Sequence, residues 1–187
     1  MKNAIAYGVD GSQRYIEFMV NSINSFHENN PDWLVDSIDT IVLSNVPNLE
    51  LPGLHPRCRP KVVPVEFDYA SRLRERNKNY LNRFTDAAMF RCELFRRQDF
   101  HDYDNILYLD CDTVVNKDVS ELFVERGEPV VFMVPICAAS EPMRRGCCVP
   151  CHSGLILFNP VRFDEMRLRM AFKDMMAAAS KSRSCVD

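Results

Sequence analysis

The order of the apolar runs constrains the fold of this chain more than any other feature. Short runs of strand length alternate along the sequence with longer segments whose apolar residues recur at helical spacing. Strands that alternate with helices favour an α/β layer sandwich, in which helices flank a mostly parallel sheet. The expected strands are residues 4–9, 39–44, 61–65, 105–109, 129–136 and 154–158, and the expected helices are residues 14–26, 83–100 and 161–179.

Length and composition fit one folded domain. The chain has 187 residues, of which 47% are hydrophobic and 26% are charged, and these shares exclude wholesale disorder. We expect a single domain over residues 1–187, either an unusually compact protein or the N-terminal part of a longer one. No apolar run reaches the about 20 residues of a spanning helix, and no signal peptide precedes the first strand. The sequence therefore predicts a cytoplasmic protein without a membrane span.

Charge and cysteine content limit the classes of function that the chain can have. A formal net charge of −3 argues against a nucleic-acid binder that works by bulk charge. The 8 cysteines, without an export signal, are expected to be free thiols. Cys147, Cys148, Cys151 and His152 resemble half of a zinc site, but the second ligand pair is missing, so a thiol-lined loop is the favoured interpretation. His27 and His55 stand in polar surroundings and are expected to be isolated surface residues.

Two acidic residues, Asp110 and Asp112, directly follow the expected strand 105–109. In an open parallel sheet, ligands bind beyond the carboxyl ends of the strands, so function is expected here and after residue 9. Carboxylates at i and i+2 project from the same side of an extended backbone and repel each other. A divalent cation that prefers oxygen ligands, Mn²⁺ or Mg²⁺, would remove that repulsion. The alternative is a solvated acidic turn.

Arg91 breaks the apolar face of the expected helix 83–100. Five of the six positions on that face are apolar, and the sixth is Arg91. A guanidinium on an apolar stripe must be paired or must reach an anion. We therefore predict that Arg91 points at Asp110 or at a bound ligand. The alternative is an arginine that extends along the core to the surface.

Three segments, taken together, resemble the nucleotide-sugar glycosyltransferases of GT-A fold, and among them family 8, the galactosyltransferase and glycogenin-like enzymes. The segments are the first strand with the helix after it, the block from the Arg91 helix through residues 105–112, and residues 153–159. The resemblance spans residues 4–175. It implies a Rossmann-like GT-A layer sandwich, a UDP-sugar donor, a glycan or glycoconjugate acceptor and, as in family 8, retention of anomeric configuration.

The resemblance also implies roles for individual residues. Asp110 and Asp112 would hold Mn²⁺ or Mg²⁺ on the diphosphate, and Arg91 would contact the donor near its sugar and phosphate. Tyr7 would stack on uracil, Asp10 would accept a hydrogen bond from it, and Ser153 would lie beside the donor sugar. The full set expected around the donor is Tyr7, Gly8, Val9, Asp10, Ser12, Arg91, Cys111, Ser153 and Gly154.

The expected catalytic residues are Asp110, Arg91, His152 and Asp187. His152 stands where family 8 usually has Asn, and it is a candidate general base, which only an inverting reaction requires. Asp187 falls about where the family carries an Asp-Gln pair. The family's third metal ligand, a histidine, has no counterpart before residue 187.

Two other functions remain open. A sugar-phosphate nucleotidyltransferase has a similar sheet, but its Gly-rich loop ending in Arg is absent after the first strand, where residues 8–12 are Gly-Val-Asp-Gly-Ser. A non-catalytic nucleotide-sugar-binding domain would explain the missing third ligand. The sequence indicates no donor sugar and no oligomeric state.

Overall fold

The computed structural model of the chain describes the backbone of residues 1–66, 86–124, 132–135 and 151–160. Side chains are described throughout these ranges except at 132–135 and 151–153. The expected helix 161–179 lies outside the described residues, as do Asp187 and the segment with Cys147 and Cys148. Within the described ranges, no helix is both long enough and apolar enough to cross a membrane.

All six expected strands are present in the structure. They are β1 (Asn3–Val9), β2 (Ile38–Ser44), β3 (Lys61–Pro64), β4 (Asn105–Leu109), β5 (Phe132–Pro135) and β6 (Cys151–Phe158). The helices are α1 (Gln13–Asn29), α2 (Asp32–Ser37), α5 (Ala87–Arg96) and the short 3₁₀ helices η1 (Gln98–Phe100) and η2 (Ser120–Phe123).

The expected helix 83–100 is wrong at its C-terminal end, because α5 stops at Arg96. Arg97 has an extended conformation (φ −92°, ψ 131°), and its guanidinium binds the Asp99 carboxylate and the Pro64 carbonyl. These contacts hold Arg97 against the end of β3, and the chain resumes as a single 3₁₀ turn, η1. Helical periodicity cannot reveal such a long-range contact.

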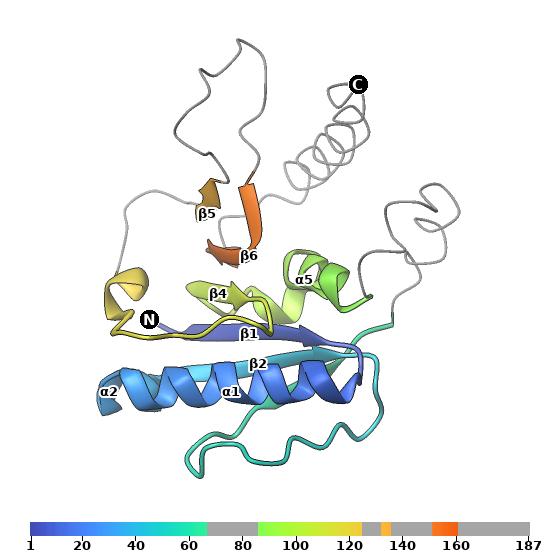
Figure 1. Cartoon of the computed structure of the whole chain (residues 1–187). Coiled ribbons are helices and arrows are strands. Elements are labelled where there is room, and N and C mark those ends of the chain that lie inside the picture. The colour runs from blue at the N-terminus through green and yellow to red at the C-terminus, as the bar shows by residue number, and fades with distance from the viewer. Residues whose placement is uncertain (67–85, 125–131, 136–150, 161–187) are drawn as a thin grey trace, which may run out of the picture.

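The sheet is mostly parallel, as expected. Its strand order is β3-β2-β1-β4-β6-β5. β1 pairs in parallel with β2 and β4, and β2 pairs in parallel with β3, whereas β6 runs antiparallel to both β4 and β5. Figure 1 shows α1 along one face of this sheet and α5 on the other.

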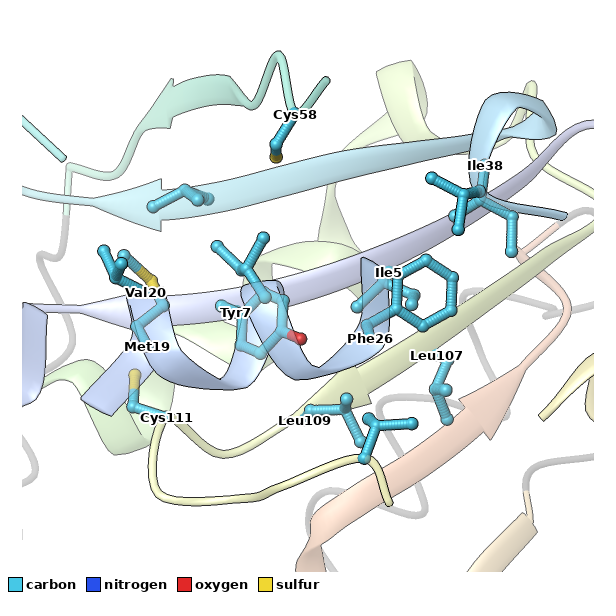
Figure 2. Close-up of a cluster of buried hydrophobic side chains, with 14 of the residues drawn as sticks. Ile5, Tyr7, Met19, Val20, Phe26, Ile38, Cys58, Leu107, Leu109 and Cys111 are labelled. Atoms are coloured by element: carbon cyan, nitrogen blue, oxygen red, sulfur yellow. The ribbon is translucent and has the colours of Figure 1, made fainter. Parts of the chain in front are cut away.

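β1 is buried along its whole length because both of its faces are covered. Its side chains alternate between two hydrophobic clusters. Ile5, Tyr7 and Val9 pack with α1, as Figure 2 shows for Ile5 and Tyr7, whereas Ala4 and Ala6 pack on the α5 side. The small residues on the α5 side allow that helix to lie close to the strand, which places Arg91 near the strand ends.

Candidate functional site

The carboxyl ends of β1 and β4 lie side by side, and the turn after β4 contacts the end of β1. Parallel pairing aligns Ala6 with Tyr108, so the two strands end at the same edge of the sheet. The Cys111 thiol, just after β4, donates a hydrogen bond to the Gly8 carbonyl at 3.0 Å. The two segments singled out by the sequence therefore form one site.

The acidic residues lie in a tight turn. The Thr113 amide and hydroxyl both donate to the Asp110 carbonyl, at 3.1 and 2.7 Å, so Cys111 and Asp112 occupy the middle of the turn. The Asp110 amide donates to the Gly154 carbonyl of β6 at 2.8 Å. The Asp110 side chain is 30% exposed and Asp112 is exposed, so both carboxylates can reach solvent.

Arg91 points at Asp110, as the sequence predicted. Its Nη2 lies 3.5 Å from Asp110 Oδ1, and only 13% of the arginine side chain is exposed. Its Nε donates to the Ala88 carbonyl at 2.6 Å, and the guanidinium lies 5.0 Å from the centre of the Tyr108 ring. The arginine is therefore fixed by a carbonyl, a ring and a carboxylate, and a polyanion at this edge would meet a positioned cation.

Besides burial, the charges of three carboxylates help to raise the pKa of the Cys111 thiol. Burial, followed by the charges of Asp110, Asp112 and Asp10, raises the pKa of Cys111 to about 12. The thiol is consequently protonated at neutral pH and serves as the donor to Gly8. Tyr108 behaves similarly, since burial raises its pKa far above the ordinary value and its hydroxyl is hydrogen-bonded to the Asp110 carboxylate.

The donor set fits a hard divalent cation. Asp110 and Asp112 supply oxygen ligands and gather negative charge that Arg91 balances in part. In the described part of the chain, no group of three His, Cys, Asp or Glu side chains is arranged to hold a metal. Mn²⁺ and Mg²⁺ suit such a site, because they are commonly held by one or two carboxylates and complete their coordination with phosphate oxygens and water.

The turn after β1 is fixed by its neighbours. The Asp10 carboxylate accepts the Ser12 amide at 3.3 Å, and Ser12 is the exposed residue just before α1. Gly11 has a φ of +85°, and a Cβ there would lie 2.5 Å from a methyl group of Val46. Only glycine meets both conditions without strain. The turn thus presents the half-buried Asp10 beside the acidic turn.

The expected stacking role of Tyr7 is wrong. Its side chain is fully buried in the α1-side core, and its hydroxyl lies 3.3 Å from the Ser22 hydroxyl. Val9 is also fully buried there, and Gly8 lies against Ala87 and Phe90 of α5. Residues at odd positions of β1 face α1, so a tyrosine at position 7 cannot reach a base beyond the strand end.

The remaining expected residues lie on or beyond β6. Gly154 is adjacent to the acidic turn through its bond to Asp110. His152 and Ser153 belong to β6, where His152 is paired with Val134, but their side chains lie outside the described set. Asp187 lies outside the described residues altogether.

Two hydroxyl residues beside the acidic turn, Ser22 and Thr113, were not predicted from the sequence. Ser22 is fully buried, and its hydroxyl lies 3.1 Å from that of Thr113, next to the acidic turn. The signal was present in the sequence, because Ser22 falls between Met19 and Phe26 on the apolar face of the first helix. A serine on such a face requires a buried partner.

Several solved glycosyltransferase structures share the fold of this chain. The apo form of the glycosyltransferase GlyE from Streptococcus pneumoniae TIGR4 superposes with a TM-score of 0.56 and 17% identity, over 95% of this chain and 39% of that one. The galactosyltransferase LgtC in complex with donor and acceptor sugar analogs gives a TM-score of 0.57 and 17% identity, over 93% of this chain and 66% of that one. The apo structure of the bifunctional glycosyltransferase WbbM gives a TM-score of 0.54 and 21% identity, over 95% of this chain and 34% of that one.

The chain is thus shorter than these neighbours, spanning between 34% and 66% of their lengths. No curated protein matches it. The fold is GT-A, as the resemblance implied. The model of the family described as "Glycosyl transferase family 8" matches residues 4–182, nearly the whole sequence. The chain therefore belongs to glycosyltransferase family 8.

Proposed function

We propose that this protein is a metal-dependent glycosyltransferase that transfers a sugar from a UDP-sugar to a carbohydrate or glycoconjugate acceptor, with retention of anomeric configuration. One observation carries the proposal: in a family 8 chain, the acidic turn 110–113 ends β4 in contact with the end of β1 and with Arg91. We propose residues 1–187 as one GT-A domain.

Each described residue of the site has a task in this proposal. Asp110 and Asp112 would hold Mn²⁺ or Mg²⁺, which neutralises the charge that develops on the departing diphosphate. Arg91 adds a fixed cation beside the same leaving group, and its contacts with Ala88 and Tyr108 keep it oriented. Asp10, in the turn after β1, accepts a hydrogen bond from the uracil. The reacting sugar, with its oxocarbenium character, would lie towards Gly154.

The test combines binding with turnover. UDP-glucose and UDP-galactose are titrated against the protein with Mn²⁺ and with EDTA, and UDP release is then assayed. The proposal predicts Mn²⁺-dependent binding and UDP release from one of the two donors. An absence of Mn²⁺-dependent binding would overturn it.

Two further outcomes distinguish the other two functions, the second in an assay with UTP and a sugar phosphate. Mn²⁺-dependent binding without UDP release, hydrolysis or transfer would favour a non-catalytic nucleotide-sugar-binding domain. A sugar-phosphate nucleotidyltransferase would instead release pyrophosphate from UTP and a sugar phosphate. Family membership and the site around Asp110 favour the glycosyltransferase over both.

A further inference from the structure

We infer that Thr113 and Ser22 are positioning residues, which orient Asp112 towards the metal through a buried chain of hydroxyl groups. The inference rests on the proposed metal-dependent function and identifies the part of the fold that arranges the ligands. Neither residue is proposed to touch the metal or the donor.

The direction of Asp112 depends on the backbone of its turn. Asp112 is exposed, and among the described residues its carboxylate makes no hydrogen bond or ion pair. Asp110, by contrast, is held by Arg91 through its side chain and by Gly154 through its amide. A ligand without contacts of its own is oriented only as well as its backbone is fixed.

Thr113 closes that turn. Its amide and its hydroxyl converge on the Asp110 carbonyl, at 3.1 and 2.7 Å. The bond from the hydroxyl is the shorter of the two, so the Thr113 side chain closes the turn together with the Thr113 backbone. Loss of the hydroxyl would leave the Thr113 amide as the one remaining bond from residue 113 to the Asp110 carbonyl, so the residue that follows Asp112 would be held less firmly.

Ser22, on α1, holds the hydroxyl of Thr113 in place. The Ser22 Oγ lies 3.1 Å from Thr113 Oγ1 and 3.3 Å from the Tyr7 hydroxyl. Ser22 and Tyr7 are both fully buried, so neither can exchange its partner for water. The chain of contacts runs from β1 through α1 to the acidic turn, and each hydroxyl restricts the rotation of the next.

Other bonds, from α1 and from Asn30 directly after it, hold the loop beyond the turn. Ser25 Oγ accepts the Val115 amide at 2.9 Å, Asn29 donates to the Val115 carbonyl at 3.1 Å, and Asn30 accepts the Val119 amide at 2.8 Å. These bonds do not involve Thr113. We therefore expect a Thr113 variant to keep the loop on α1 while losing control of Asp112.

The experiment compares Thr113→Val with Thr113→Ser and a matched control. Thr40→Val is the control, because Thr40, on β2, also carries a hydrogen-bonded hydroxyl, which accepts from the Cys58 thiol. UDP affinity is measured by calorimetry at saturating Mn²⁺ and again in EDTA, and the ratio of the two affinities reports the metal's contribution. Thermal unfolding of each variant is recorded in parallel.

The inference predicts that Thr113→Val lowers the ratio about tenfold while UDP affinity in EDTA is unchanged. Thr113→Ser, which keeps the hydroxyl, should have a ratio within about twofold of the wild-type value. Thr40→Val should have the wild-type ratio even if its melting temperature falls as far as that of Thr113→Val. A wild-type ratio in Thr113→Val overturns the inference alone, as does a loss that Thr113→Ser fails to repair. A wild-type protein whose UDP affinity ignores Mn²⁺ overturns the proposed function and the inference together.

Discussion

Among single residues, Gly8 shows how tightly side-chain size is limited where β1 passes α5. A Cβ on Gly8 would lie 2.9 Å from the Ala87 carbonyl oxygen and 3.2 Å from Phe90 Cβ. The nearest obstacle is backbone, so it cannot rotate away. The same helix carries Arg91, and for this reason the size of residue 8 bears on both stability and the site.

Gly8→Ala should therefore lower the free energy of unfolding by about 1–3 kcal/mol, because α5 must shift to relieve the overlap. Urea denaturation measures this change directly. The displacement of α5 should also weaken Mn²⁺-dependent UDP binding through Arg91. Unchanged stability would show that α5 does not lie as close to β1 as described.

Asp112→Ala separates binding from folding. Because Asp112 is exposed and its carboxylate makes no hydrogen bond or ion pair among the described residues, its removal should change the free energy of unfolding by less than about 0.5 kcal/mol. Mn²⁺-dependent UDP binding should nevertheless be lost, as calorimetry would show. Asp102→Ala is the matched control, since it removes the same charge from an exposed position at the opposite end of β4. Equal UDP affinity in the two variants would refute the role of Asp112.

At the scale of elements, the long connection between β2 and β3 is fastened to α1 by polar contacts. Asn24 donates to the Gly53 carbonyl at 2.9 Å and accepts the His55 amide at 2.7 Å. The His27 and His55 rings stack with centroids 4.9 Å apart. The expectation that these histidines are isolated was wrong, because the contact joins residues that are distant in sequence.

This stack should make stability depend on pH. Burial first, and then the neighbouring His55 and Arg57, lower the pKa of His27, with Asp36 acting in the opposite direction. The unfolded chain, with a histidine pKa of about 6.5, then takes up a proton more readily than the folded protein. The contribution of His27 is present in full above about pH 6.5 and is lost as the pH falls through the folded pKa.

Urea midpoints at pH 7.5 and pH 5.5 test this dependence. The wild-type midpoint should fall on acidification by more than that of His27→Gln, which has no imidazole to protonate. His101→Gln is the control, because His101 is exposed and lies after η1, away from the stack. Parallel behaviour of wild type and His27→Gln would contradict the prediction.

The elements also show what the sequence could and could not predict. Compact apolar runs located all six strands, and the charged Arg91 on an apolar helix face predicted a partner, Asp110 or a ligand, of which the structure shows Asp110. The end of α5 and the stacked histidines depend on contacts between distant segments. The predicted stacking role of Tyr7 was wrong for a different reason. The face to which Tyr7 points depends on which side of β1 is covered by α1, and the alternation of side chains along a strand does not specify that side.

For the whole molecule, ligand binding should appear as added stability. A ligand at about 100 times its dissociation constant stabilises the folded state by about 2.7 kcal/mol, or roughly 5–10 °C for a chain of this size. UDP with Mn²⁺ should raise the melting temperature by this amount in differential scanning fluorimetry, and EDTA should abolish most of the increase. An equal increase in EDTA would mean that UDP binds without the metal.

The antiparallel strand β6 has a consequence for the order in which the site forms during synthesis. β1, β2 and β4 leave the ribosome first and can pair with one another, yet the amide of Asp110 finds its acceptor only in Gly154 of β6. Until β6 docks, the acidic turn has one edge without support. We expect a nascent chain that ends before β6 to hold a recognisable α/β core and no competent donor site, so that activity begins once β6 has paired with β4.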